Sequence, residues 1–365
     1  MRLLSGICCG LAFLSLGACA PVTQRIAVDS AKVEEEARKQ REIAVEEMFS
    51  DQQRLYRVTY PLITKAHQLC GDKTNYATGA IIVNRLFFGR DFAEATAKVL
   101  GVKEELSVVY VVPGSPAEVS GLRVGDVVQS LGGTPLKADN EDWPEVSRKL
   151  RASLEEGKLA QLGIVRAGLP MQVELMPERA CAFRSHLANQ DAVNAYADGN
   201  RVVVTKGMMR FVRDDNELAL VIGHELAHNA MGHMDAKRGN FVLGSILDVL
   251  AAAYGVNTQG TFGNAAASAY SQDFEAEADY VGLYMMAYAG LDLEKAPHFW
   301  RRMASAHPGS IKGRGMMASH PATPERFVAL EEAIKEIRNK QASGAVLKPE
   351  MKKTETASAP VEQSP

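Results

Sequence analysis

Two short motifs of acidic residues and histidines constrain this chain more than any other feature. His224, Glu225 and His228 form a His-Glu-x-x-His motif inside an apolar run with helical spacing. On a helix, residues four apart differ by about 40° in azimuth, so both histidines project from one face and can bind one tetrahedral metal ion. Glu275 and Asp279 share a face of a second predicted helix by the same spacing. The sequence therefore predicts two helices whose facing sides supply one metal site.

The residue types in these motifs indicate the chemistry of the site. Two imidazoles and the Glu275 carboxylate are a ligand set of catalytic zinc, here one ion per chain, with one coordination position left open. Asp279 is expected to hold a ligand imidazole through its second ring nitrogen. Glu225 lies beside the ligand face, where it can accept a proton from a water molecule that zinc activates. The pattern predicts a hydrolytic zinc site.

A third histidine, His233, follows the first motif. It does not fit the metzincin pattern, which would place a ligand one residue later, where this chain has Met234. If the helix continued, His233 would lie about 140° from His228, so we expect a role at the helix end or in solvent. Glu277 lies about 200° from Glu275 on its helix and is expected to point away from the site.

From residue 181 to about residue 330, the chain resembles the gluzincin peptidase family that includes HtpX, BepA, the mitochondrial Oma proteases and the CAAX prenyl endopeptidase. Besides the two motifs above, the similar segments occur in family order at residues 194–197, 202–207, 217–219, 319–321 and 325–326. The resemblance implies the same three zinc ligands and the same general base. It also places His320 and Arg326 near the site, where they would stabilise the oxyanion or support the active-site wall. In BepA-like members a histidine of this region can instead plug the metal, which leaves the role of His320 open.

Val202, Val203 and Val204 form a short β-branched strand after a turn at residues 198–200. By family resemblance it is the edge strand beside the metal cleft. The backbone of a substrate would pair with it, which suits unfolded or extended proteins. The helix of the first motif is expected to start at residues 214–217, and the Gly-rich stretch 255–263 is expected to be a mobile loop.

A second module precedes the peptidase-like region. Residues 111–117 (Val-Val-Pro-Gly-Ser-Pro-Ala) and 121–128 (Gly-Leu-Arg-Val-Gly-Asp-Val-Val) resemble a bacterial PDZ domain. Such domains bind an extended peptide, usually a carboxyl terminus, along an exposed strand edge. Leu100, Gly101 and Val102 are the candidate carboxylate loop, with a plain structural turn as the alternative. Peptide carboxyl termini are therefore expected partners.

The amino terminus resembles a bacterial export signal. Arg2 precedes an apolar run that ends in small residues before Cys19, a pattern typical of lipoprotein processing. Cys19 would carry the acyl chains that anchor the protein to a membrane. Ala20 rather than Asp follows, which by resemblance to sorted lipoproteins favours the outer membrane, facing the periplasm. An ordinary cleaved signal is the alternative. The apolar run 241–256 is too short to span a bilayer.

Cys70 and Cys181 are the thiols that remain if Cys8 and Cys9 leave with the signal and Cys19 is acylated. In an oxidising compartment they can pair in one way. The chain-entropy model gives such a long loop up to about 4.7 kcal/mol of stabilisation. Two unrelated buried thiols are the alternative.

Length and composition fit a chain of two domains. Of 365 residues, 46% are hydrophobic and 23% charged, and the net charge of −3 gives no reason to expect nucleic acid as a partner. The fold class predicted is α+β, with a mainly helical zincin peptidase domain, a short active-site sheet and an inserted β-rich PDZ domain. The expected layout is a signal peptide at 1–18, a lipid-anchored charged helical stalk at 19–65, a lead-in at 66–90, the PDZ domain at 91–178, the peptidase domain at 181–340 and a disordered tail at 341–365.

The sequence as a whole predicts a lipid-anchored zinc endopeptidase of the bacterial envelope. Its substrates would be misfolded or exposed-terminus proteins, captured with the help of the PDZ domain. The alternative is a PDZ-based scaffold or chaperone with latent peptidase activity. Glu225 argues against this alternative, because a scaffold does not need a general base.

Overall fold

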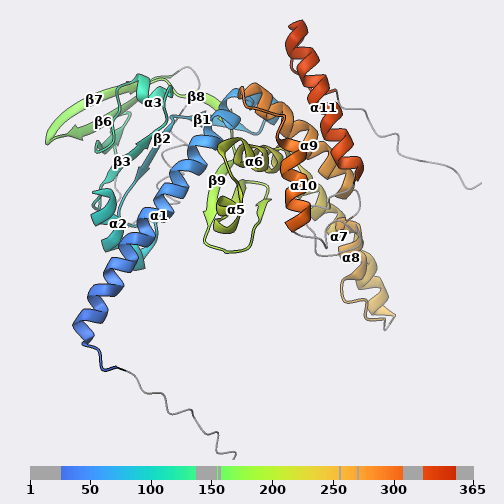
Figure 1. Cartoon of the computed structure of the whole chain (residues 1–365), viewed down its shortest axis with the longest axis horizontal. Helices are drawn as coiled ribbons and strands as arrows, with labels where there is room; N and C mark the ends of the chain where they lie inside the picture. The colour runs from blue at the N-terminus through green and yellow to red at the C-terminus, as the bar shows by residue number, and fades with distance from the viewer. Residues whose placement is uncertain are drawn as a thin grey trace, which may run out of the picture. The chain divides into compact units, whose positions relative to one another are not determined.

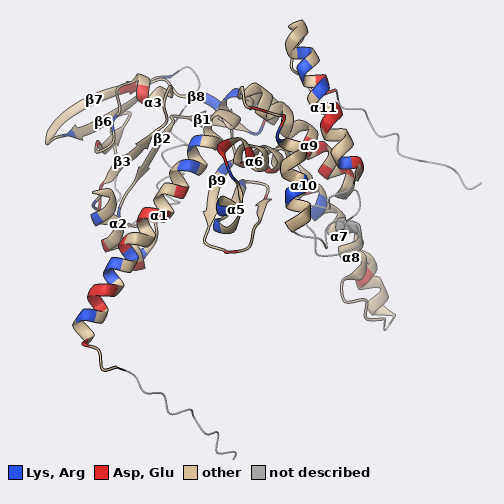
Figure 2. Cartoon of the chain, in the orientation of Figure 1, with Lys and Arg blue, Asp and Glu red and all other residues tan. Residues whose placement is uncertain are grey.

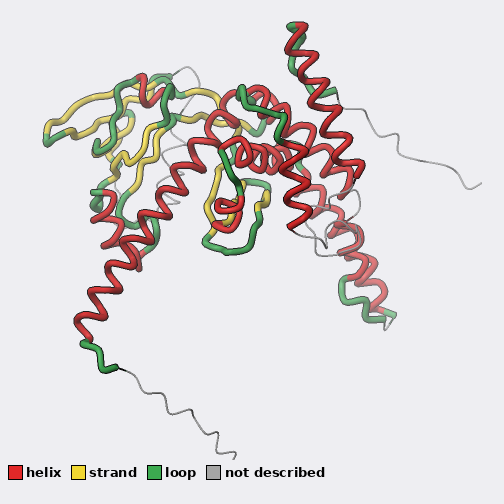
Figure 3. The backbone as a smooth tube through the Cα atoms, in the orientation of Figure 1, coloured by secondary structure: helices red, strands yellow, loops and turns green. Residues whose placement is uncertain are grey.

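The computed structural model describes residues 26–136, 154, 158–254, 256–268, 271–306 and 324–350. Cys19 and His320 lie outside these residues. The chain divides into a short unit, Met1–Gln40, and a large unit, Arg41–Pro365. Within the large unit, strands gather in the PDZ-like part and helices dominate the peptidase-like part (Figure 3). This arrangement agrees with the predicted α+β class.

Helix α1 runs over Ser30–Lys65 and belongs to both units. Its first turns are exposed and carry acidic and basic side chains in alternation (Figure 2). Farther along, Leu55 and Leu62 are buried in the peptidase core, and Val45 is buried against side chains of the PDZ-like part. A solvated stalk over residues 19–65 is therefore wrong for the second half of α1, because this half packs into the large unit.

The PDZ-like part is an antiparallel sheet with the strand order β2-β3-β4-β6-β7 (Figure 1). Its strands are β2 (Ala80–Val83), β3 (Leu106–Val111), β4 (Val127–Leu131), β6 (Ala160–Arg166) and β7 (Leu169–Leu175), with β5 (Thr134–Pro135) beside β4. Two helices accompany it, α2 (Ala93–Leu100) and α3 (Pro116–Val119). The sheet begins at Ala80, before the expected domain boundary at residue 91, and β2 lies at its edge.

The candidate carboxylate loop, Leu100 to Val102, has another role. Gly101 adopts the left-handed conformation, with φ of 67°, and ends α2, while Val102 is buried. A peptide that pairs antiparallel with the edge strand β2 has its carboxyl end beside the start of that strand, which follows Thr78 and Gly79. The prediction is wrong because this loop lies at the far end of β2, where the N–H of Arg85 donates to the carbonyl of Lys103 at 2.9 Å. The glycine serves as a helix cap, which was the structural alternative.

Two short strands connect the PDZ-like part to the peptidase part. The chain enters through β1 (Thr74–Ala77) and leaves through β8 (Glu178–Cys181), and these strands pair antiparallel with Thr74 opposite Cys181. Cys70, just before β1, is joined to Cys181 by a disulfide with the two Cα atoms 5.7 Å apart. Both ends of the inserted domain are therefore held at one place.

The peptidase part contains a three-stranded sheet with the order β10-β11-β9. These strands are β9 (Arg184–Ala188), β10 (Ala195–Ala197) and β11 (Arg201–Thr205). Strand β11 pairs in parallel with β9 and antiparallel with β10, so both of its edges are occupied. Its residues Val202, Val203 and Val204 are buried, as expected for a central strand. The prediction that these three valines form the edge strand is wrong.

Helices make up most of the peptidase part. They are α5 (Lys206–Phe211), α6 (Asp215–Ala230), α7 (His233–Ala253), α8 (Thr261–Ser268), α9 (Ser271–Tyr288), α10 (Ala296–Ala306) and α11 (Pro324–Ser343). After α11 the backbone N–H of Glu350 donates a hydrogen bond to the Tyr280 hydroxyl at 2.9 Å. The predicted disordered tail, 341–365, is therefore wrong as far as Glu350, because this segment packs on α9.

Helices α7 and α8 form an antiparallel pair with few charged side chains (Figure 2). The carboxylate of Asp248 accepts a hydrogen bond from the backbone N–H of Gly263 at 2.8 Å, which ties α7 to α8. Helix α8 starts at Thr261, so the last three residues of the mobile loop predicted at 255–263 are helical. Within the described ranges, no helix has the length and apolar character that a membrane span requires.

Helices α6 and α9 approach each other at two glycines. A Cβ atom on Gly223 would lie 3.1 Å from the Gly282 carbonyl oxygen, and a Cβ on Gly282 would lie 2.9 Å from the backbone nitrogen of His224. An added Cβ would therefore force a backbone shift at Gly282 and make a tight contact with backbone at Gly223. The two glycines therefore set the separation of the helices that carry both sequence motifs.

We predict that Gly282→Ala forces α6 and α9 apart, because the added methyl group meets the backbone of His224. Overpacking of this kind costs about 1–3 kcal/mol, so the melting temperature should fall by several degrees and bound metal should decrease. Gly239→Ala on α7 is the matched control, since nothing lies within 4 Å of its added methyl group. Calorimetry with metal analysis measures both effects. Equal melting temperatures for the two variants would contradict the prediction.

Candidate metal centre

Helix α6 begins where the sequence predicts. The Asp214 carboxylate accepts a hydrogen bond from the N–H of Glu217 at 2.9 Å, and the Glu217 carboxylate accepts one from the N–H of Arg213 at 2.7 Å. The bond to Asp214 caps the first turn, and the bond from Arg213 ties the preceding residue to it. The rest of the helix is almost entirely buried, so it carries its histidines into the interior of the domain.

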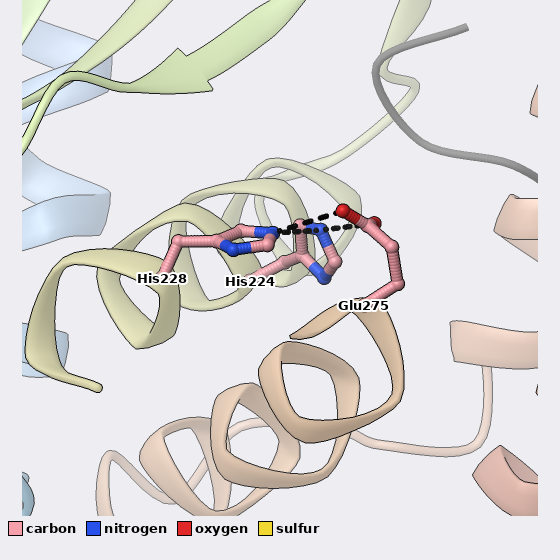
Figure 4. Close-up of side chains that lie close together, drawn as sticks. All are labelled: His224, His228 and Glu275. Atoms are coloured by element: carbon pink, nitrogen blue, oxygen red, sulfur yellow. Dashed lines mark hydrogen bonds and ion pairs between the residues drawn. The ribbon is translucent and has the colours of Figure 1, made fainter. Parts of the chain in front are cut away.

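His224 and His228 project from α6 toward Glu275 on α9 (Figure 4). The Nε2 atoms of the two histidines are 3.1 Å apart. The Glu275 carboxylate lies 3.3 Å from Nε2 of His224 through one oxygen and 3.4 Å from Nε2 of His228 through the other. All three side chains are buried, with donor atoms within 4.8 Å of one another. The structure therefore brings together the three predicted ligands.

These separations fit a zinc ion. Zinc binds imidazole nitrogen and carboxylate oxygen at about 2.0–2.2 Å, so neighbouring tetrahedral ligands are about 3.3–3.6 Å apart. The two distances to Glu275 lie in this range, and the distance between the histidines is slightly shorter. Two neutral imidazoles and one carboxylate are also the donor set found in catalytic zinc sites. Both the spacing and the chemistry of the three donors match this metal.

The Asp279 carboxylate holds the His224 ring at Nδ1, the nitrogen that does not face the metal site. The Nδ1 atom of His224 lies 2.9 Å from Oδ1 of Asp279, the contact expected from the sequence. Arg326, on α11, donates two hydrogen bonds to Asp279 and lies over the Trp300 ring at 4.5 Å. Burial acts to raise the pKa of Asp279, but the charge and hydrogen bonds of Arg326 outweigh it and lower the pKa. Arg326 thus supports Asp279, and its two expected roles at the oxyanion or the active-site wall remain predictions.

The two ligand histidines differ in their electrostatic environments. Burial acts to lower the pKa of both. For His224 the hydrogen bonds and charges of Asp279 and Glu275 outweigh burial and raise the pKa to about 9. For His228 burial prevails, aided by the charge of His224, and lowers the pKa to about 4. Because a metal must displace the proton from a ligand nitrogen, its affinity should increase as the pH rises.

His233 holds the second ligand from the start of the next helix, a supporting role that the prediction did not include. Gly232 adopts a left-handed φ of 75° and separates α6 from α7, which begins at His233. The Nδ1 atoms of His228 and His233 are 2.8 Å apart, and Nε2 of His233 lies 2.8 Å from a Glu277 oxygen. His233 is 2% exposed and stacks on Phe274. As expected, His233 lies at a helix end and outside the group of three ligands, but it is buried rather than in solvent, and Glu277 contacts it. The glycine that follows the motif is the sequence feature from which the end of the helix could have been predicted.

Glu225 is 3% exposed and follows the first ligand on α6. Its charge acts on the pKa of both His228 and Arg326, which places it close to the metal ligands. His320 lies outside the described residues, so its two expected roles remain predictions.

We predict that His233→Ala lowers zinc affinity about 10- to 100-fold, as is usual when the partner of a ligand imidazole is lost. The reason is that the Nδ1 atom of His228 loses its hydrogen-bond partner. His233→Gln should restore part of the affinity, because the amide oxygen can accept the same bond. His298→Ala, an exposed histidine on α10, is the matched control. Competition with a chromophoric chelator measures the affinity, and an unchanged value for His233→Ala would disprove the supporting role.

Comparison with known proteins supports the same interpretation of the site. Residues 171–334 match the model of peptidase family M48, and residues 107–159 match the PDZ domain model. The mitochondrial metalloendopeptidase OMA1 of Schizosaccharomyces pombe is 28% identical over 162 residues, which are 43% of this chain and 48% of the relative. The metalloprotease YcaL of Escherichia coli K12 is 32% identical over 151 residues, 39% of this chain and 58% of the relative.

A third relative is the beta-barrel assembly-enhancing protease of Yersinia pestis, which is 28% identical over 160 residues, 40% of this chain and 33% of the relative. This chain thus spans between 33% and 58% of the length of these three relatives. The family match contains all three candidate ligands. Motifs, geometry and similarity together show that the chain carries a peptidase family M48 domain, joined to a PDZ domain on its amino-terminal side.

Proposed function

We propose that the protein is a zinc-dependent endopeptidase that hydrolyses misfolded or exposed-terminus proteins of the bacterial envelope. The observation that carries this proposal is the convergence of His224, His228 and Glu275, with Glu225 on the same helix as the two histidines. A zinc ion held by these residues would polarise the scissile carbonyl and lower the pKa of water to about 7. The matched relatives named as metalloendopeptidase and metalloprotease support this reaction class.

In this proposal each side chain of the site has its own role in catalysis. Glu225 accepts the proton of the attacking water and transfers it to the leaving amine. Asp279 and His233 orient the two ligand imidazoles through their Nδ1 atoms. His320 either stabilises the oxyanion or blocks the site as an inhibitory ligand in the resting protein.

Strand β10, rather than β11, is the edge we propose for substrate binding. It pairs with β11 on one side, lies against α6 and carries Tyr196, which is 38% exposed. The backbone of an extended substrate can pair with this edge, so recognition would depend little on side chains. Unfolded or extended proteins offer such a segment, which favours them as substrates.

The PDZ domain would capture peptide carboxyl termini at the edge of β2. Pairing with an exposed strand edge is the general mode of peptide binding by these domains. Because the domain is joined to the peptidase part through β1 and β8, a captured substrate would reach the metal centre at a high effective concentration, up to the millimolar range for a short tether.

We also propose that acyl chains on Cys19 anchor the protein at the outer membrane, facing the periplasm. The small residues before Cys19 support lipidation. The Cys70–Cys181 pair supports an oxidising compartment, because disulfides persist there.

We predict that Glu225→Gln retains zinc but hydrolyses unfolded casein slower by orders of magnitude, because the ligands remain and the general base is lost. A chelator should abolish the hydrolysis by the natural protein, and added zinc should restore it. Glu275→Ala is the contrasting variant and should lose metal and activity together. Near-normal turnover by Glu225→Gln would contradict its role as the general base, and hydrolysis that resists chelation would contradict the role of the metal. Absence of hydrolysis by the natural protein would support the scaffold alternative.

We predict that Cys19→Ser releases the protein into the soluble periplasmic fraction, because the acyl anchor is lost. Fractionation of cells with washed membranes measures this change. Retention of the variant on washed membranes would show that another anchor exists.

A further inference from the structure

Helices α7 and α8 carry a large exposed apolar surface. The two helices extend side by side from the peptidase part and pack mainly on each other (Figure 1). Six aliphatic residues of α7 are each more than half exposed, namely Val242, Leu243, Ile246, Leu247, Val249 and Leu250. They belong to the apolar run 241–256, which is too short to span a bilayer. Exposed apolar surface of this extent indicates contact with a partner or a membrane.

The exposed apolar surface covers most of the circumference of α7. At about 100° per residue, the six side chains span about 160°, and the exposed Phe241 extends this arc to about 240°. The remaining side includes Asp248, which bonds to α8. A helix that packs on a protein core has an apolar stripe about 100° wide that faces inward. Helix α7 shows the reverse arrangement, with its apolar residues facing outward.

The outer surface of the helix pair carries no charge. In the sequence from residue 239 to residue 272, Asp248 is the only charged residue (Figure 2). Its carboxylate accepts hydrogen bonds from the N–H of Gly263 at 2.8 Å and from the N–H of Phe262 at 3.2 Å. The one carboxylate is therefore engaged within the helix pair and does not oppose burial of the outer surface.

The residue types of this surface favour lipid over protein. Protein interfaces are enriched in aromatic residues, Met and Arg, whereas Val, Leu and Ile form this surface. The other charged residues of α7, Asp235, Lys237 and Arg238, lie in its first two turns, and the exposed Tyr254 follows its last residue. Charged and aromatic side chains at the borders of an aliphatic segment are typical of contact with a bilayer. A protein partner would also have to surround α7 to cover its apolar arc, while acyl chains adapt to any shape.

We propose that α7 and α8 insert this apolar surface into one leaflet of a membrane and lie along the interface without crossing it. Helices of this kind are buried about 5–10 Å into the boundary between headgroups and acyl chains. Helix α7 starts at His233, which contacts the ligand His228, so the insertion would hold the metal centre close to the membrane. This contact adds to the proposed acyl anchor at Cys19 and to the proposed peptidase function, and depends on neither.

Binding through this surface alone is reversible, because stable anchoring needs more than one element. The chain with Cys19→Ser therefore leaves membranes when they are washed, as predicted above. In the same chain, however, binding to vesicles should be measurable at equilibrium.

The test uses the full chain with Cys19→Ser and vesicles of phosphatidylethanolamine and phosphatidylglycerol. Energy transfer from the tryptophans of the protein to a dansyl-labelled lipid measures binding. Leu243→Glu with Leu250→Glu should weaken binding at least about tenfold, because two charges would have to leave water. Val119→Glu with Val328→Glu adds the same charge at exposed apolar residues of α3 and α11, and should leave binding unchanged. Equal melting temperatures verify that the variants are folded.

A second measurement distinguishes insertion from binding at the surface. A polarity-sensitive fluorophore is attached at Leu247→Cys on α7 and, for comparison, at Val119→Cys, which is also exposed. With vesicles, the emission of the label on α7 should shift to the blue and be quenched by lipids that carry a quencher on the acyl chain. The emission of the label on α3 should not change.

Absence of vesicle binding by the Cys19→Ser chain, equal binding after Leu243→Glu with Leu250→Glu, or an unshifted label on α7 would each overturn the proposal. A dimer in lipid-free solution that these two glutamates dissociate, without vesicle binding, would overturn it in favour of a second copy of the chain. Casein hydrolysis by the natural protein is measured separately. Its absence would contradict the proposed peptidase function and leave the vesicle result unchanged.

Discussion

The contact between Gly223 and Gly282 determines whether this domain has a metal centre. Two helices can supply ligands to one ion only if their axes are close enough for short side chains to meet, and here backbone touches backbone. His224 directly follows the glycine of α6, and Asp279 lies one turn before the glycine of α9. The contact between the two helices therefore also brings His224 close to Asp279, the carboxylate that orients it.

Around this contact, each ligand imidazole is held at its Nδ1 atom, which leaves Nε2 to face the metal site. Asp279 and Arg326 fix His224, and His233 with Glu277 fixes His228. Asp279, Arg326 and His233 are buried, so water cannot readily replace them as partners, while Glu277 at the outer end of the second arrangement is partly exposed. A site that is arranged before the metal binds loses less conformational entropy on binding.

The two domains also share structural elements. Helix α1 contributes to the peptidase core and packs on the PDZ sheet, and β1 with β8 holds both ends of the inserted domain beside the Cys70–Cys181 bridge. Substrate capture and cleavage would then occur in one connected unit.

Local patterns predicted much of the site, and nonlocal packing explains the errors. The spacing of His224 and His228, and of Glu275 and Asp279, is a property of one helix, so it was readable from the sequence. The edge position of a strand depends on its neighbours in space, and for this reason Val202 to Val204 were misplaced. A helix-end position was expected for His233, but its contact with His228 was not, because that contact depends on the direction in which the left-handed Gly232 turns the chain.

The boundaries of a domain and the burial of a charged helix also depend on contacts between segments that are distant in the sequence. Strand β2 has four residues and no strong pattern of its own, so the PDZ sheet was expected to begin too late. Helix α1 is rich in charge, yet its second half is buried by two different clusters. Neither fact follows from the composition of the segment alone.

The central claim is that His224, His228 and Glu275 hold one zinc ion. Anomalous diffraction from crystals of the zinc-loaded protein, recorded above and below the zinc absorption edge, tests it most directly. The account predicts one peak per chain, at about 2.0–2.2 Å from Nε2 of both histidines and from the Glu275 carboxylate. A zinc peak elsewhere in the chain, with these three side chains left uncoordinated, would contradict it.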